Sequence, residues 1–121
     1  MWRLRGHRVV GFDSELRGTV GARWLAKQGS AASVPLSCNS LLTQAAAVVA
    51  GIGLSPLPCV FGDPEPSLER IVSRTIGHHD LWLVVHPDLK SNARVRAVMA
   101  YLTESVLSET ALLAGNSRLK R

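Results

Sequence analysis

Residues 33–54 decide the fold and read SVPLSCNSLLTQAAAVVAGIGL. The first six of these residues predict a short strand. Asn39 and Ser40 follow as candidate capping residues for a helix over residues 41–50. Apolar residues spread around more than one face of that helix, so we expect it to be mostly buried. Gly51 is well placed to end the helix in the left-handed conformation.

The neighbouring segments continue an alternation of strands and helices. Residues 8–12 (RVVGF) predict a strand, and residues 52–58, bounded by prolines, predict another. Between the first two strands, Ser14 is a candidate cap for a helix that Gly18 and Gly21 weaken. The apolar face of that helix would hold Leu16, Val20 and Trp24. Strand–helix–strand alternation implies an α/β fold with parallel strands.

The C-terminal third contains one more expected strand and one amphipathic helix. Residues 80–86 hold an unbroken apolar run, LWLVV, which is typical of a strand covered on both faces, with Trp82 in the core. Ser91 can cap the helix that follows. Apolar residues of this helix recur at helical spacing: Val95, Val98, Met99, Leu102 and Val106.

Length and composition bound the class of protein. The chain has 121 residues and 46% hydrophobic content, which suits one folded domain and excludes a disordered chain. Its net charge of +5 is concentrated toward the ends, because residues 1–30 carry +4, residues 31–90 carry −2 and residues 91–121 carry +3. Basic and aromatic residues form no common stripe, so we expect no nucleic-acid surface. With two cysteines and no visible export signal or membrane span, we expect a cytoplasmic protein.

Motifs for catalysis, cofactors and metals are not found. Gly51 and Gly53 lack the third glycine of a dinucleotide fingerprint, and the sequence has no phosphate-binding loop, nucleophile elbow or Cys-x-x-Cys pair. His78, Asp80 and His86 share one face of an extended strand, but the two histidines would lie too far apart to bind one ion. We therefore predict no enzyme, no cofactor and no metal site.

The ends of the expected strands hold the remaining candidate binding residues. Asn39 and Ser40 lie where a strand meets a helix N-terminus, which attracts carboxylates and phosphates. Phe12 and Asp13 end another strand, and residues 56–59 follow the third. In open α/β sheets, ligands bind beyond the carboxyl ends of the strands. Plain helix capping is the alternative explanation for Asn39 and Ser40, and the two roles can coexist.

Several stretches together resemble the effector-binding region of LysR-type transcriptional regulators. No one of them is diagnostic, but their order and spacing extend the resemblance over residues 9–106. The stretches are residues 39–45 (NSLLTQA), 50–54 (AGIGL), 57–59 (LPC), 81–89 (LWLVVHPDL) and 93–98 (ARVRAV).

This resemblance implies an α/β fold of the periplasmic-binding-protein-like (type 2) kind, built from two lobes. Residues 8–88 would form lobe two, and residues 89–114 the C-terminal helix that returns to lobe one. An N-terminal extension (1–7) and a basic tail (115–121) would flank them. The effector-binding residues implied are Phe12, Asp13, Asn39, Ser40, Pro58 and Cys59. Leu16, Val20 and Trp24 resemble a surface through which subunits pair, although Trp24 suits the lobe core as well.

The function implied by the resemblance is allosteric control of transcription. A small-molecule effector, often a carboxylate, binds between the lobes and changes how a homo-oligomeric regulator contacts DNA. The family binds DNA through an N-terminal winged helix-turn-helix, and no such pattern is visible here, so we expect a fragment that does not bind DNA or membranes by itself. The alternative is a stand-alone solute-binding module of the same fold.

Overall fold

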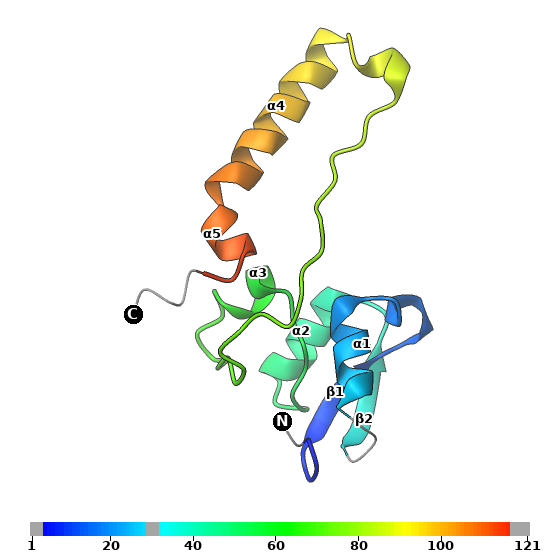
Figure 1. Cartoon of the computed structure of the whole chain (residues 1–121), viewed down its shortest axis with the longest axis vertical. Coiled ribbons are helices and arrows are strands. Elements are labelled where there is room, and N and C mark those ends of the chain that lie inside the picture. The colour runs from blue at the N-terminus through cyan, green and yellow to red at the C-terminus, as the bar shows by residue number, and fades with distance from the viewer. Residues whose placement is uncertain (1–3, 29–31, 117–121) are drawn as a thin grey trace. The chain divides into compact units, whose positions relative to one another are not determined.

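A computed structural model describes residues 4–28 and 32–116, and within these ranges the chain divides into two compact units. The first unit ends at His78 and the second begins at His79. Parts of the expected N-terminal extension (residues 1–3) and basic tail (residues 117–121) lie outside the described residues. Figure 1 labels most of the elements, which are β1 (Arg8–Phe12), η1 (Ser14–Leu16), α1 (Val20–Lys27), β2 (Ser33–Cys38), α2 (Leu41–Val49), α3 (Cys59–Gly62), η2 (Pro87–Leu89), α4 (Ala93–Ser108) and α5 (Thr110–Leu113).

Strands β1 and β2 pair in parallel, as the strand–helix–strand alternation predicted. On its other side β1 forms a single parallel bridge, between Val9 and Leu54. The N–H of Val10 donates to Leu54 O, and the N–H of Leu54 donates to Arg8 O, both at 2.9 Å. The strand predicted over residues 52–58 is therefore reduced to one bridge. Pro56 ends the pairing, because the next hydrogen bond of this parallel ladder would need an N–H at residue 56, and proline has none.

Pro56 leaves the carbonyl of Val10 without a backbone partner, and two side chains donate hydrogen bonds to it instead. Val10 O accepts a hydrogen bond from Ser55 Oγ at 3.0 Å and another from Gln44 Nε2 at 3.3 Å. Gln44 Nε2 also donates to Ser55 Oγ at 2.7 Å. Gln44 is fully buried, and its Oε1 has no hydrogen-bond partner. Buried backbone carbonyls are normally paired, so these side chains complete the ladder where the backbone fails.

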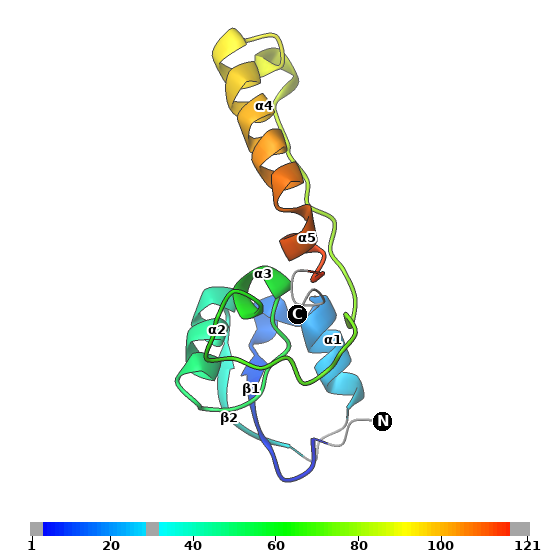
Figure 2. The ribbon, with the colours of Figure 1, turned by 90° about the vertical axis from the view of Figure 1, so that its left-hand side faces the viewer.

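The core of the first unit lies between β1, β2 and α2. Its buried members are Val10, Cys38 and Ala47. Helix α2 packs on both strands, α1 packs on β1, and Figure 2 shows the two helices on either side of β1. The prediction that α2 is mostly buried was wrong, because only Gln44 and Ala47 are buried and Leu42 is 67% exposed.

The helix ends differ from the sequence predictions at two of the three expected caps. Helix α1 begins only at Val20, where Thr19 Oγ1 accepts from the Ala22 N–H at 3.3 Å, so Ser14 does not cap it and Leu16 lies in η1 instead. Asn92, not Ser91, caps α4. The cap of α2 is confirmed, since Ser40 Oγ accepts from the Thr43 N–H at 3.4 Å.

The left-handed end of α2 is also confirmed. Gly51 follows the helix with a φ of 77°, a conformation that glycine adopts without a Cβ clash. Its N–H donates to Val48 O, and the next N–H, of Ile52, donates to Ala47 O at 3.1 Å. The chain therefore turns sharply from α2 into the segment that bridges β1.

The second unit consists of an extended segment followed by helices η2, α4 and α5. The prediction of a strand over residues 80–86 was wrong, as was the placement of Trp82 in a core. Trp82 is 79% exposed and Val84 is 86% exposed. A strand needs a hydrogen-bonded neighbour, and the described residues 79–116 contain no strand with which residues 80–86 could pair. Helix α4 forms where predicted, with Val98 and Leu102 of its apolar face exposed.

Candidate functional site

The six residues implied to bind an effector lie in the first unit, next to the carboxyl ends of its strands and the start of α3. Phe12 is the last residue of β1, and Asn39 directly follows β2. Phe12 is paired in register with Cys38, and the Asp13 N–H donates to Cys38 O at 2.9 Å. The fold therefore brings Phe12, Asp13 and Asn39 to one edge of the sheet.

The ring of Phe12 forms part of the packing at this edge. A methyl group at Gly21 of α1 would lie 3.0 Å from the Phe12 ring and 3.1 Å from the Pro56 side chain. Glycine at position 21 thus allows α1 to approach both side chains, whereas the sequence indicated only its cost to the helix. Phe12 is partly exposed and remains accessible beside Asp13.

The N-terminus of α2 supplies the hydrogen-bond donors of the site. The Thr43 N–H donates to Ser40 Oγ, and the Gln44 N–H donates to Ser40 O at 3.0 Å. The N–H groups of Leu41 and Leu42 precede these two, and helix geometry gives them no acceptor within the helix. Together with the positive end of the helix dipole, these groups can bind a carboxylate oxygen.

Pro58 and Cys59 occupy the start of α3, which packs against α2. Cys59 is partly buried, and its Sγ accepts a hydrogen bond from Arg70 Nη2 at 3.6 Å. The same guanidinium forms an ion pair with Asp63, whose side chain is only 4% exposed. Hydrogen bonding to Asp63 raises the pKa of Arg70 above its ordinary value, and burial opposes this, so the guanidinium stays charged.

Arg70 and Asp63 were not among the residues that the sequence predicted for the site. Their ion pair joins residues seven positions apart through an irregular segment after α3, where neither helical nor strand spacing predicts which side chains meet. The only available signal was one acidic and one basic residue on either side of a proline-rich segment. The structure adds a fixed positive charge beside Cys59.

Comparison with known families decides what kind of domain this is. The family model described as the LysR substrate binding domain matches residues 3–107. The chain belongs to this family. The resemblance inferred from the sequence is therefore confirmed. Domains of this family have the periplasmic-binding-protein-like type 2 fold, and the described residues form a mixed structure of helices and strands. No curated protein and no solved structure gave a significant match.

Membership of the LysR substrate-binding family supports effector sensing in a transcriptional regulator. Family members are regulators rather than enzymes, and they act as oligomers. In the described residues, no three His, Cys, Asp or Glu side chains are placed to hold a metal ion. The same part of the chain has no helix long and apolar enough to cross a bilayer.

The surface predicted for subunit pairing, Leu16, Val20 and Trp24, is not one face of a single helix. Leu16 lies in η1, while Val20 and Trp24 lie in α1. All three are partly buried. A methyl group at Gly77 would overlap Val20, so the chain at Gly77 already covers that side chain. A pairing surface formed by Leu16, Val20 and Trp24 therefore stays a prediction.

Proposed function

We propose that the carboxyl edge of the first unit binds a small carboxylate effector and senses it for a LysR-type transcriptional regulator. The N-terminus of α2 carries this proposal, because Ser40 caps the helix and leaves the N–H groups of Leu41 and Leu42 for a ligand. The ends of β1 and β2 lie beside Asn39, as binding in open α/β sheets requires.

The carboxylate of Asp13 limits which chemical groups an effector can place beside it. Its Oδ1 accepts a hydrogen bond from the Ser14 N–H at 2.6 Å, and the side chain is exposed. A carboxylate at this position repels a second anion but accepts hydrogen bonds from a hydroxyl or amino group. We therefore propose an effector that carries a carboxylate for the α2 N-terminus and a donor group for Asp13.

The remaining expectations about the sensor belong to the same proposal. Residues 8–88 act as lobe two and residues 89–114 as the helix that returns to lobe one, with the effector held between lobes. The effector changes the regulator by binding one arrangement of the lobes better than another, since equal affinity for both would shift nothing. Pro58 and Cys59 complete the lobe-two wall of this site.

Backbone amides at the helix start report directly on binding. We expect salicylate, which carries a carboxylate and a hydroxyl, to move the amide resonances of Leu41 and Leu42 in NMR titrations of the chain. Salicylamide has the same ring without the charge and serves as the control probe. Equal effects of the two probes would contradict an anion site at α2.

Variants at Ser40 separate ligand binding from helix capping. Ser40→Ala removes the cap and should cost about 1 kcal/mol of stability and weaken salicylate binding about threefold. Ser40→Asp keeps a capping oxygen but adds a negative charge, so stability holds while salicylate binding falls about tenfold or more. Thr19→Ala removes the matched cap of α1 and should leave binding unchanged. Unaltered salicylate affinity in Ser40→Asp would refute the assignment.

A further inference from the structure

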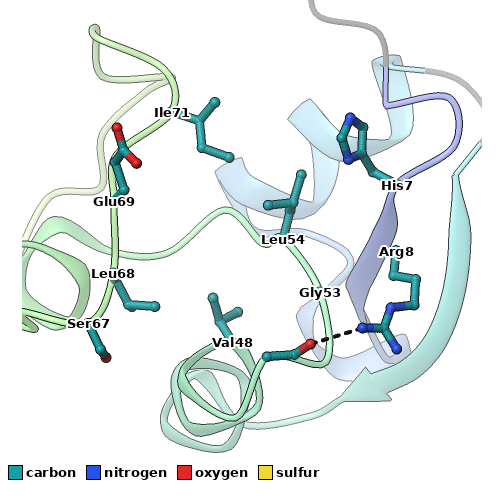
Figure 3. Close-up of a pocket in the computed structure, with 10 residues that line it drawn as sticks. His7, Arg8, Val48, Gly53, Leu54, Ser67, Leu68, Glu69 and Ile71 are labelled. Carbon is teal, nitrogen blue, oxygen red and sulfur yellow. Dashed lines mark hydrogen bonds between the residues drawn. The ribbon is translucent and has the colours of Figure 1, made fainter.

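An open surface cavity of about 450 Å³ lies at the other edge of the first unit, where β1 begins and α2 ends. Figure 3 shows side chains from three chain segments around it: the start of β1, the end of α2 with the following bridge residue, and the irregular segment 67–71. Its volume falls within the range of ligand sites, roughly 300–1,000 Å³. None of the six candidate effector residues lines it.

The lining of the cavity is largely apolar. Val48 of α2 and Leu54 of the bridge form one side, while Leu68 and Ile71 approach from the irregular segment (Figure 3). Val48, Leu54 and Leu68 are all partly exposed, so their apolar surface is open to solvent and available to a ligand. An aromatic or branched aliphatic group would bury this surface on binding.

One positive and one negative side chain line the cavity and would orient a charged ligand. Arg8 and Glu69 come from opposite walls (Figure 3). Arg8 Nη2 donates to Gly51 O at 3.2 Å, which holds the guanidinium at the negative end of the α2 dipole. A guanidinium has five N–H donors, so this single bond leaves others for a ligand. An anionic group is drawn toward Arg8 and repelled from the Glu69 side.

We propose that this cavity is a second ligand site, which takes a small amphipathic carboxylate. The apolar body of the ligand lies on Val48, Leu54 and Leu68, and its carboxylate meets Arg8. Arginine and carboxylate form strong charge-assisted hydrogen bonds, and this contact fixes the orientation of the ligand. The site is independent of the proposed effector site at the α2 N-terminus, because the two use different residues at opposite ends of the same helix.

The probe for this site is 4-phenylbutanoate, with 4-phenylbutanamide as the uncharged control. In NMR titrations of the chain, the carboxylate should shift the amides of Gly53, Leu54 and Glu69 and bind about fivefold more tightly than the amide. Arg8→Gln removes the positive charge and keeps a polar, uncharged side chain, and should weaken carboxylate binding about fivefold. Arg23→Gln removes an exposed arginine of α1 that does not line the cavity, and should change nothing.

Several outcomes would overturn the second site. Equal binding by the Arg8→Gln and Arg23→Gln variants would show that the guanidinium does not recognise the carboxylate. Shifts at Leu41 and Leu42 that Ser40→Asp abolishes would place the probe at the effector site instead. A lack of saturable shifts up to about 10 mM probe would remove the cavity as a ligand site. Binding that persists unchanged in Ser40→Asp supports the proposal and does not depend on the effector site.

Discussion

The apolar residues of β1 in the first unit and those of the extended segment in the second unit differ sharply in burial. In the first unit, Val9 and Val10 of β1 are almost completely buried. In the second unit, Trp82 and Val84 lie in an equally apolar run and are largely exposed. The first unit surrounds its strand with a parallel partner, a bridge and helices, whereas the described part of the second has only one extended segment and its helices. Hydrophobic sequence therefore predicts burial only where a neighbouring element exists to cover it.

Hydrogen bonds differ between the units in the same sense. Gln44 Nε2 and Ser55 Oγ reach Val10 O across more than 30 positions of sequence, so they fix tertiary structure. The side-chain bonds that the structure shows in α4 stay within one turn, as Thr103 Oγ1 donating to Met99 O at 2.8 Å illustrates. Such local bonds specify a helix but not its neighbours.

A matched pair of valines tests this contrast with the largest expected effect. Val10→Ala removes two methyl groups from a fully buried side chain and should lower the free energy of unfolding by about 2–3 kcal/mol. Val84→Ala makes the same chemical change at an exposed position and should alter it by less than about 0.5 kcal/mol. Chemical denaturation followed by circular dichroism measures both values. Comparable costs would mean that the extended segment is packed in solution as firmly as β1.

The same contrast explains which elements the sequence predicted. Strands β1 and β2 and the cap of α2 follow from local signals: apolar runs, Ser40 before a helix and Gly51 after it. The strand predicted over residues 80–86 also had a local signal, its apolar run. A strand forms only beside a hydrogen-bonded neighbouring strand, however, and an apolar run does not show whether that neighbour exists. The bridge at Leu54 shows the intermediate case, since Pro56 stops the ladder after one pair.

For the candidate site, the sequence predicted positions better than contacts. Placement of Phe12 and Asn39 at strand ends required only the strand boundaries. The ion pair of Arg70 with Asp63 depends on the path of an irregular segment, which no periodicity encodes. Burial of Gln44 was equally invisible, because a glutamine in a helix is usually exposed unless a specific unpaired carbonyl faces it.

A double-mutant cycle at Val10 O tests the long-range bonds with the next largest effect. Gln44→Met and Ser55→Ala each leave one donor on this carbonyl, so each should cost about 1 kcal/mol. The double variant leaves a buried carbonyl unpaired and should cost about 1–2 kcal/mol more than the sum. Ser55→Thr keeps the hydroxyl and serves as the control. Strict additivity in urea denaturation would show that the two donors do not share Val10 O.

The smallest expected effect concerns Glu65 and Ser67, which form local hydrogen bonds in the irregular segment after α3. Glu65 Oε1 accepts from Ser67 Oγ at 2.6 Å and from the Ser67 N–H at 3.0 Å, and these bonds, the side-chain one first, lower the pKa of Glu65 below its ordinary value of 4.5. A lowered pKa in the folded state means that the stabilisation is present above pH 4.5 and is lost as the pH falls through the folded value. Ser67→Ala removes the side-chain hydrogen bond, which is the larger cause of the lowered pKa. An NMR titration should therefore find the Glu65 pKa closer to its ordinary value in Ser67→Ala and unchanged in the control variant Ser73→Ala. A Glu65 pKa unchanged by Ser67→Ala would show that the bond from Ser67 Oγ does not persist in solution, unlike the long-range bonds to the buried Val10 O.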